Sequence, residues 1–183
     1  AGRIEPVIEL ATAIELLHTA LLLHADVIDG DVERRGAPNL VGAFAAAAGR
    51  AGLSEPGAHR WGQSAAILAG DLLLTAAVRL TAGLDLDPKR RDQLVDLVDE
   101  SIFRAAAGEL ADVAYASGLG TPTPDEIREM MADKTAHYSL ELPLRAGHEQ
   151  PRRETVDEDA RARDGGDRPF RDRLRVAEAV HRF

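Results

Sequence analysis

Apolar residues recur every three or four positions along much of the chain, which is the spacing of helices with a buried face. The first such stretch runs from Pro6 to Asp29, and its apolar residues are dense enough to predict burial around most of the helix: Ile8, Leu10, Ile14, Leu17, Leu21 and Ile28. Gly30, Gly36 and Pro38 then interrupt the pattern. A loop is therefore predicted directly after Asp29.

The same spacing predicts three further helices, starting near residue 58, at residue 88 and at residue 124, and ending near residues 82, 116 and 148. Gly70 in the second helix permits close contact with a neighbouring helix, and Gly83 is placed to cap its end. Thr123 is predicted to cap the start of the fourth helix, with Pro124 at the first helical position.

Composition supports an all-α chain. Of the 183 residues, 45% are hydrophobic but only 4% are aromatic, so the core is expected to consist of small and aliphatic side chains in closely packed helices. Trp61 and Phe103 are expected in that core. Residues 151–183 differ, because they hold nine arginines, eight acids and no lysine. We expect a helical domain over residues 1–150 and an Arg-rich tail over 151–183 that ends in a short helix.

Charge and cysteine content exclude several classes of function. The chain has 31 acidic and 22 basic side chains and a net charge of −9, which argues against nucleic-acid binding. It has no cysteine, so disulfides and thiol chemistry are excluded. We find no signal peptide and no run of about 18 apolar residues, so the sequence predicts no transmembrane segment and a cytoplasmic protein.

An acidic pair and a basic pair lie close together after the first predicted helix. Asp26 and Asp29 stand three residues apart on one face of that helix, where their carboxylates could converge on Mg²⁺. Arg34 and Arg35 follow on the predicted loop. Apolar flanks distinguish this acidic pair from an ordinary solvated helix end, and the arrangement suits a diphosphate bridged by Mg²⁺.

The residues around these pairs resemble the trans-isoprenyl diphosphate synthase (polyprenyl synthetase) family. Residues 16–38 read LLHTALLLHADVIDGDVERRGAP, and the family pattern is LLHxxxLxHDDxxD followed by RRGxP. Further stretches agree in the same order: AILAGDLLL at 66–74, GELAD at 108–112, and Lys134-Thr135 before YSLELPLRAG. The resemblance covers about residues 7–148.

This resemblance implies a partial isoprenoid-synthase helical bundle around a central prenyl cavity. The family activity is a Mg²⁺-dependent prenyltransferase reaction of isoprenoid biosynthesis, the condensation of an allylic diphosphate with isopentenyl diphosphate. By resemblance, Asp26 and Asp29 belong to the metal motif. Arg34 would hold the allylic diphosphate and Arg35 the isopentenyl diphosphate, while Lys134 would hold the leaving group.

The resemblance also implies that the protein forms a dimer and that one residue of the first helix influences the length of the prenyl product. Relatives pair through helices like the Ala-rich second and third ones, so we expect a homodimer or a heterodimer with a complete synthase. A missing subdomain alone could also expose the apolar surface of these helices. Ala20, five residues before Ala25, would leave the floor of the prenyl cavity open to long products.

The chain departs from the family pattern at three places. Ala25 stands where the family has an aspartate that binds the metal directly, and the second aspartate-rich motif, FQxxDDxxD, has no counterpart. The opening segment AGRIEP matches the family's GKRxRP only loosely. Whether the chain is an enzyme is therefore open. It could be a prenyltransferase domain, a non-catalytic partner subunit of a complete synthase, or a truncated or inactivated form.

Several other polar residues lie on the predicted helices. Glu109 is interpreted either as support for the diphosphate region or as a polar residue at a helix contact. Asp71 lies in an apolar helix, where an unpaired acid is costly, so a hydrogen-bonded supporting role is expected. His18 and His24 are interpreted as interior histidines with hydrogen-bond partners rather than as ligands or bases.

Overall fold

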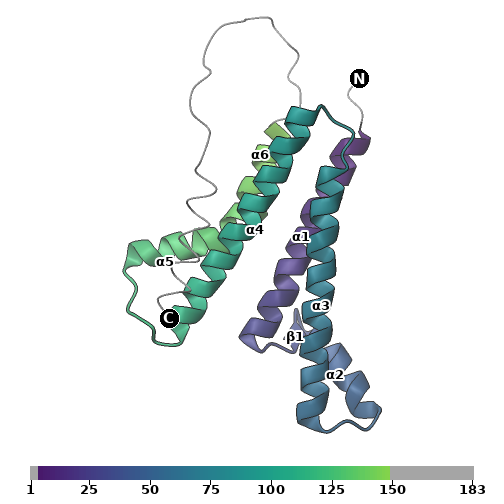
Figure 1. The fold of residues 1–183 in the computed structure, drawn as a ribbon. Coiled ribbons are helices and arrows are strands. Elements are labelled where there is room, and N and C mark those ends of the chain that lie inside the picture. The colour runs from purple at the N-terminus through teal and green to yellow at the C-terminus, as the bar shows by residue number, and fades with distance from the viewer. Residues whose placement is uncertain (1–3, 149–183) are drawn as a thin grey trace, which may run out of the picture. The chain divides into compact units, whose positions relative to one another are not determined.

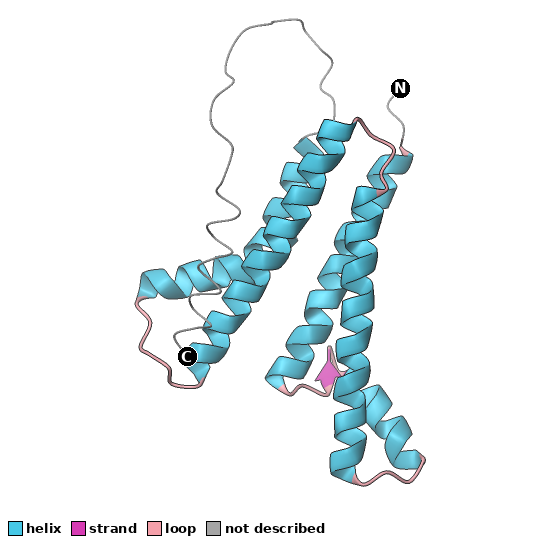
Figure 2. Ribbon diagram, viewed as in Figure 1, coloured by secondary structure: helices cyan, strands magenta, loops and turns pink. Residues whose placement is uncertain are grey.

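A computed structural model describes residues 4–148, and helices account for most of this span (Figures 1 and 2). The helices are α1 (Glu5–Asp29), α2 (Leu40–Arg50), α3 (Glu55–Ala82), α4 (Pro88–Ala116), α5 (Pro124–Met131), the π-helix η1 (Ala132–Glu141) and α6 (Leu142–His148). The predicted all-α class is confirmed. The predicted tail, residues 151–183, lies outside the described residues.

The chain divides between Val95 and Asp96 into two compact units. This division falls inside α4, where no glycine, proline or change of composition marks it in the sequence. The predicted boundary after residue 150 lies outside the described residues and stays a prediction.

The predicted helix ends agree with the structure where a local cap defines them. Thr123 caps α5 by accepting a hydrogen bond from the backbone N–H of Glu126, and the Glu126 carboxylate accepts one from the backbone N–H of Thr123. This backbone hydrogen bond, followed by one from the Thr123 hydroxyl, lowers the pKa of Glu126. Gly83 caps α3 as predicted, while α3 begins at Glu55, three residues before the predicted start.

Two helices were not predicted. Helix α2 was missed because LVGAFAAAAGR is short and rich in alanine and glycine. The Asn39 side chain caps it by accepting a hydrogen bond from the N–H of Gly42 at 3.0 Å. The π-helix η1 was also missed, since the fourth helix was predicted as α-helical throughout. Its backbone hydrogen bonds join residues five positions apart, whereas those of an α-helix join residues four positions apart.

A short hairpin replaces the predicted loop between α1 and α2. Strand β1 (Glu33–Arg34) pairs antiparallel with β2 (Ala37–Pro38), so that Arg34 lies opposite Ala37. The two residues of the turn, Arg35 and Gly36, have positive φ angles of 57° and 77°. Such a turn matches the twist of the strands that it joins, although a left-handed conformation is unusual for arginine.

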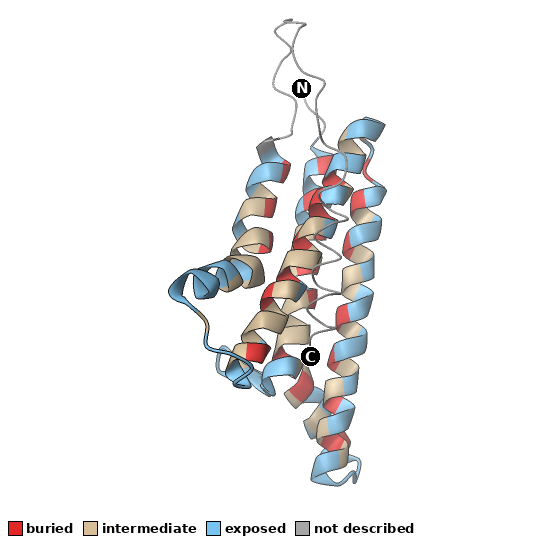
Figure 3. Ribbon diagram, turned by 60° about the vertical axis from the view of Figure 1, so that its left-hand side comes forward, coloured by how far each residue is buried: buried red, intermediate tan, exposed pale blue. Residues whose placement is uncertain are grey.

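Helix α3 packs against both α1 and α2 in the first unit, through small residues (Figure 1). A Cβ atom at Gly62 would lie 2.3 Å from the carbonyl oxygen of Val41 in α2, and one at Gly70 would lie 2.4 Å from the ring of His24 in α1. The buried residues of α1 include Leu10, Leu17 and Ala20. Figure 3 shows how such buried positions recur along the helices. Helix α3 thus meets the backbone of α2 at Gly62, and Gly70 leaves room for the ring of His24.

Much apolar surface remains exposed on α1 and α3. Trp61, expected in the core, is 55% exposed, because it lies on the face of α3 away from the small residues; Leu72 is 73% exposed. Within the described residues both helices are long and apolar enough to cross a membrane, contrary to the sequence expectation of no such segment. Core helices of soluble proteins have the same length and composition, so this property assigns neither helix to a membrane.

Candidate functional site

The end of α1 places the two aspartates of the acidic motif in different surroundings. Gly30 caps the helix in the left-handed conformation, with φ of 74°, and the N–H of Asp31 donates to the carbonyl of Asp26 at 2.9 Å. The side chain of Asp26 is 3% exposed, whereas Asp29 is exposed to solvent. The acidic pair therefore does not present two equivalent carboxylates.

Arg34 of the hairpin binds Asp26 directly. Its Nε donates to Oδ1 of Asp26 at 2.8 Å, and its Nη2 donates to the same oxygen. The hydrogen bond to Asp26 raises the pKa of the half-buried Arg34, whereas burial lowers it. The charges of Asp26, Asp31 and Asp29 raise the pKa further, so that it is raised overall. Arg35, at the tip of the turn, is exposed.

His24 joins α1 to α3 one turn before the acidic motif ends. Its Nε2 lies 3.2 Å from Oδ1 of Asp71 and 3.3 Å from the carbonyl oxygen of Ile67. The ring fits there because Gly70 has no side chain. Asp71 has the predicted hydrogen-bonding partner, and His24 is a partnered histidine as expected, but the Asp71 side chain is 61% exposed.

Lys134, in the second unit, is held by two carboxylates of α4. Its Nζ lies 2.5 Å from Oδ2 of Asp112 and 3.2 Å from Oε1 of Glu109. Burial lowers the pKa of Lys134, but the hydrogen bonds to Asp112 and Glu109 and their negative charges outweigh it, so the pKa is raised. Lys134 is therefore a charged ammonium at neutral pH.

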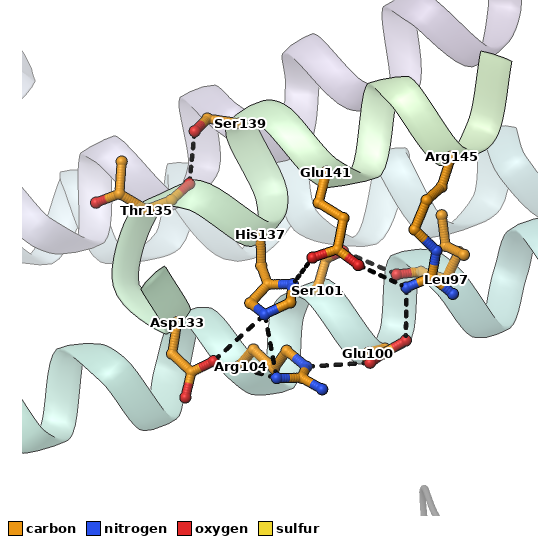
Figure 4. A network of polar contacts seen from close by, with 10 residues as sticks. All are labelled: Leu97, Glu100, Ser101, Arg104, Asp133, Thr135, His137, Ser139, Glu141 and Arg145. Atoms are coloured by element: carbon orange, nitrogen blue, oxygen red, sulfur yellow. Dashed lines mark hydrogen bonds and ion pairs between the residues drawn. The ribbon is translucent and has the colours of Figure 1, made fainter. Parts of the chain in front are cut away.

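A network of polar side chains fixes η1 beside α4 (Figure 4). Nη1 of Arg104 donates to Nε2 of His137 at 3.1 Å and to Oδ1 of Asp133 at 3.3 Å, and its Nε donates to Glu100. Because Nε2 of His137 accepts from Arg104, its Nδ1 carries the proton and donates to Glu141 at 2.6 Å. The sequence analysis missed this network, although Asp133 and Glu141 flank His137 at four-residue spacing, which is a sequence signal for such pairs.

The residues at the end of α1 do not fit a divalent cation. Residues 4–148 contain no group of three His, Cys, Asp or Glu side chains that could hold a metal ion. Position 25 offers only a methyl group, and the buried carboxylate of Asp26 already accepts two hydrogen bonds from Arg34. The nearby carboxylates of Asp29 and Asp31 are exposed to solvent, and among the described residues neither belongs to a group of three side chains that could hold Mg²⁺.

Comparison with known proteins establishes the family. The profile of the polyprenyl synthetase family matches residues 1–162. The chain belongs to the polyprenyl synthetase family. The predicted relationship to the trans-isoprenyl diphosphate synthases is thereby confirmed.

Individual polyprenyl synthetases show the extent of the similarity. The chain is 33% identical to a short chain isoprenyl diphosphate synthase of Methanothermobacter thermautotrophicus, over 69% of this chain and 33% of that one. It is 32% identical to a geranylgeranyl diphosphate synthase of Mycobacterium tuberculosis, over 69% of this chain and 31% of that one. The chain thus spans about a third of the length of these curated relatives.

A solved polyprenyl synthetase structure agrees with the fold. The crystal structure of a geranylgeranyl pyrophosphate synthetase from Pyrococcus horikoshii superposes with a TM-score of 0.65 at 29% identity. The superposition covers 81% of this chain and 40% of that one. The described helices are therefore part of a larger all-α family fold.

The motif residues expected from the family sequence fall in two groups. Asp26 and Arg34 lie together in the first unit, and Lys134 lies with Glu109 and Asp112 in the second. A shared cavity lined by all the motif residues stays a prediction. Ala20, expected at the cavity floor, is completely buried on α1, so its role in product length also stays a prediction.

Gly108 positions Lys134, and replacing Gly108 with alanine tests this. A Cβ atom at Gly108 would lie 2.2 Å from the backbone N and 2.7 Å from the Cα of Lys134, so η1 would have to move away from α4. We expect Gly108→Ala to lower the free energy of unfolding by roughly 1–3 kcal/mol. Chemical denaturation measures this change.

Gly147→Ala is the matched control, because nothing lies within 4 Å of a Cβ atom at Gly147. That helical position should accept alanine with no loss of stability. Equal stability of both variants would contradict the close contact between Gly108 and η1.

Proposed function

We propose that the chain is the N-terminal part of a trans-isoprenyl diphosphate synthase fold, whose complete form condenses an allylic diphosphate with isopentenyl diphosphate. The match to the polyprenyl synthetase profile over residues 1–162 carries this proposal, because it includes every basic motif residue. The relatives named above are isoprenyl diphosphate synthases. A cytoplasmic location belongs to the same proposal.

The proposed task of the basic residues is to hold negative charge on diphosphate groups. Arg34 binds the allylic diphosphate, Arg35 the isopentenyl diphosphate, and Lys134 the diphosphate that leaves. Fixed cations of this kind stabilise the charge that develops on a leaving diphosphate, and apolar helix walls keep water from the allylic cation. The positive charge that the hydrogen bonds of Lys134 preserve supports this task.

Magnesium belongs to the proposal for the complete family fold only. Asp26 and Asp29 are the motif carboxylates on this chain, but they do not fit the ion by themselves, as described above. The chain's own contribution to the reaction is therefore the binding of diphosphate by Arg34, Arg35 and Lys134, and Arg34 would have to exchange its hydrogen bonds to Asp26 in order to bind.

A second candidate is a non-catalytic partner subunit of a complete synthase. The exposed apolar residues of α1 and α3 favour it; those more than half exposed are Ile8, Trp61, Leu68 and Leu72. Large exposed apolar areas often mark an association surface. Both candidates share the diphosphate-binding residues, so they differ in turnover and in association.

Binding of inorganic pyrophosphate tests the proposed function. We expect the full chain to bind pyrophosphate in calorimetry, and Lys134→Gln to weaken binding about tenfold or more, because a charged hydrogen bond is lost. Arg128→Gln is the control, since Arg128 is an exposed cation paired with Asp125 on α5 and lies outside the family motifs. Equal affinities of the two variants would contradict the role of Lys134.

Turnover by the 183-residue chain is expected to be very low. Loss of one group that stabilises transition-state charge costs about 10²–10³-fold in rate, and this chain lacks the carboxylate at position 25 and the second acidic motif. Incorporation of radiolabelled isopentenyl diphosphate with Mg²⁺ measures it, against a complete family member. Ala25→Asp should not restore the rate, and rapid product formation by the unaltered chain would contradict this expectation.

Association is expected because of the apolar surface on α1 and α3. We expect sedimentation to show a dimer, or a complex with a complete synthase, at concentrations on the order of tens of micromolar. Leu72→Glu, at the most exposed of these positions, should weaken association, whereas Glu129→Gln on α5 should not. A monomer under all these conditions would argue against the partner-subunit candidate.

A further inference from the structure

Asp26 is the one charged side chain among the buried polar residues of the described chain, beside Thr81 and Ser101. A buried carboxylate is costly unless it is paired and hydrogen-bonded. Arg34 supplies both, since its Nε and Nη2 donate to the same carboxylate oxygen. The burial of Asp26 therefore depends on a residue of the hairpin.

The backbone around Asp26 continues this connection into α2. The carbonyl of Asp26 accepts from the N–H of Asp31, and the carbonyl of Asp31 accepts from Nδ2 of Asn39 at 2.9 Å. The N–H of Asn39 donates to the carbonyl of Val32 at 3.1 Å. Gly42 approaches this same carbonyl so closely that a Cβ atom would lie 2.2 Å from its oxygen. The hairpin is thus tied to the end of α1 and to the start of α2.

We propose that Asp26 and Arg34 form a structural clasp, which holds the hairpin against the end of α1 in place of a divalent-cation site. A cation at Asp26 would have to displace a guanidinium from a buried carboxylate and would leave Arg34 without this partner. The alanine at position 25 supplies no oxygen ligand to compensate for the lost contact with Arg34, and Asp29 is exposed to solvent.

This inference goes beyond the proposed function, because the clasp concerns how the hairpin is held and not whether the chain turns over. The inference gives Asp26 and Asp29 different structural roles. Asp26 supports the conformation of the turn that carries Arg35, whereas Asp29 acts on Arg34 only through its charge.

Magnesium titration of the unaltered full chain is the first test. A ligand that binds only the folded chain raises its thermal unfolding midpoint. If the clasp is not a cation site, MgCl₂ should raise this midpoint no more than NaCl of equal ionic strength does. A rise specific to Mg²⁺ that disappears in Asp26→Asn would overturn the proposal.

Amide hydrogen exchange of the full chain is the second test, with Asp29→Asn as the matched control. In Asp26→Asn we expect the amides of residues 31–39 to exchange about tenfold faster or more, because the hairpin loses its ion pair to α1. Asp29→Asn should change exchange far less, because Asp29 acts on Arg34 only through its charge. Equal exchange in both variants would overturn the proposal.

A charge reversal tests the pairing even where Asp26→Asn unfolds. The variant Asp26→Arg should lose protection of residues 31–39, and the double variant Asp26→Arg with Arg34→Asp should regain part of it. A double variant no better protected than Asp26→Arg would overturn the clasp. Ala25→Asp should introduce a rise of the unfolding midpoint with Mg²⁺, since it adds the missing carboxylate.

Discussion

Close approach of helix backbones is the constraint on which the rest of this structure depends. With 4% aromatic residues, the chain has few large side chains to fill space between helices, so the helices meet through glycine and alanine. Gly62 brings α3 to α2, Gly70 brings it to α1, and Gly108 brings α4 to η1. Each contact leaves no room for a methyl group. The small residues therefore determine where the side chains beside them can reach.

The polar residues of the family motifs lie next to these contacts. His24 rests on Gly70 and so meets Asp71, the next residue of α3. Lys134 has its backbone against Gly108, and its side chain meets Glu109 in the adjacent position and Asp112 one turn further on. The glycine in each motif is thus a geometric requirement for the polar contact. The glycines at positions 70 and 108 therefore determine both how the helices pack and which polar side chains meet.

Local signals made part of this structure predictable from sequence. Thr123 and Gly83 mark helix ends through short-range caps, and both were predicted correctly. The acidic and basic pairs were predicted to be neighbours, but not that Arg34 would bind Asp26, because this depends on the left-handed turn at Arg35 and Gly36. The π-helix was missed because its residues continue the helical spacing of the segment before them. Its backbone lies against Gly108 at Lys134, a contact between residues far apart in sequence.

The ion pairs also determine how readily each basic residue can bind an anion. A cation that already has a carboxylate partner can bind a diphosphate only by exchanging that partner. At Arg34 the exchange would leave Asp26 buried and uncompensated, a cost of up to about 3–5 kcal/mol before solvent screening at the half-exposed Arg34 reduces it. At Lys134 the partners Glu109 and Asp112 are less buried than Asp26, so solvent can compensate them. Lys134 and the exposed Arg35 are therefore the readier sites for an incoming diphosphate, and Arg34 is the one most committed to the fold.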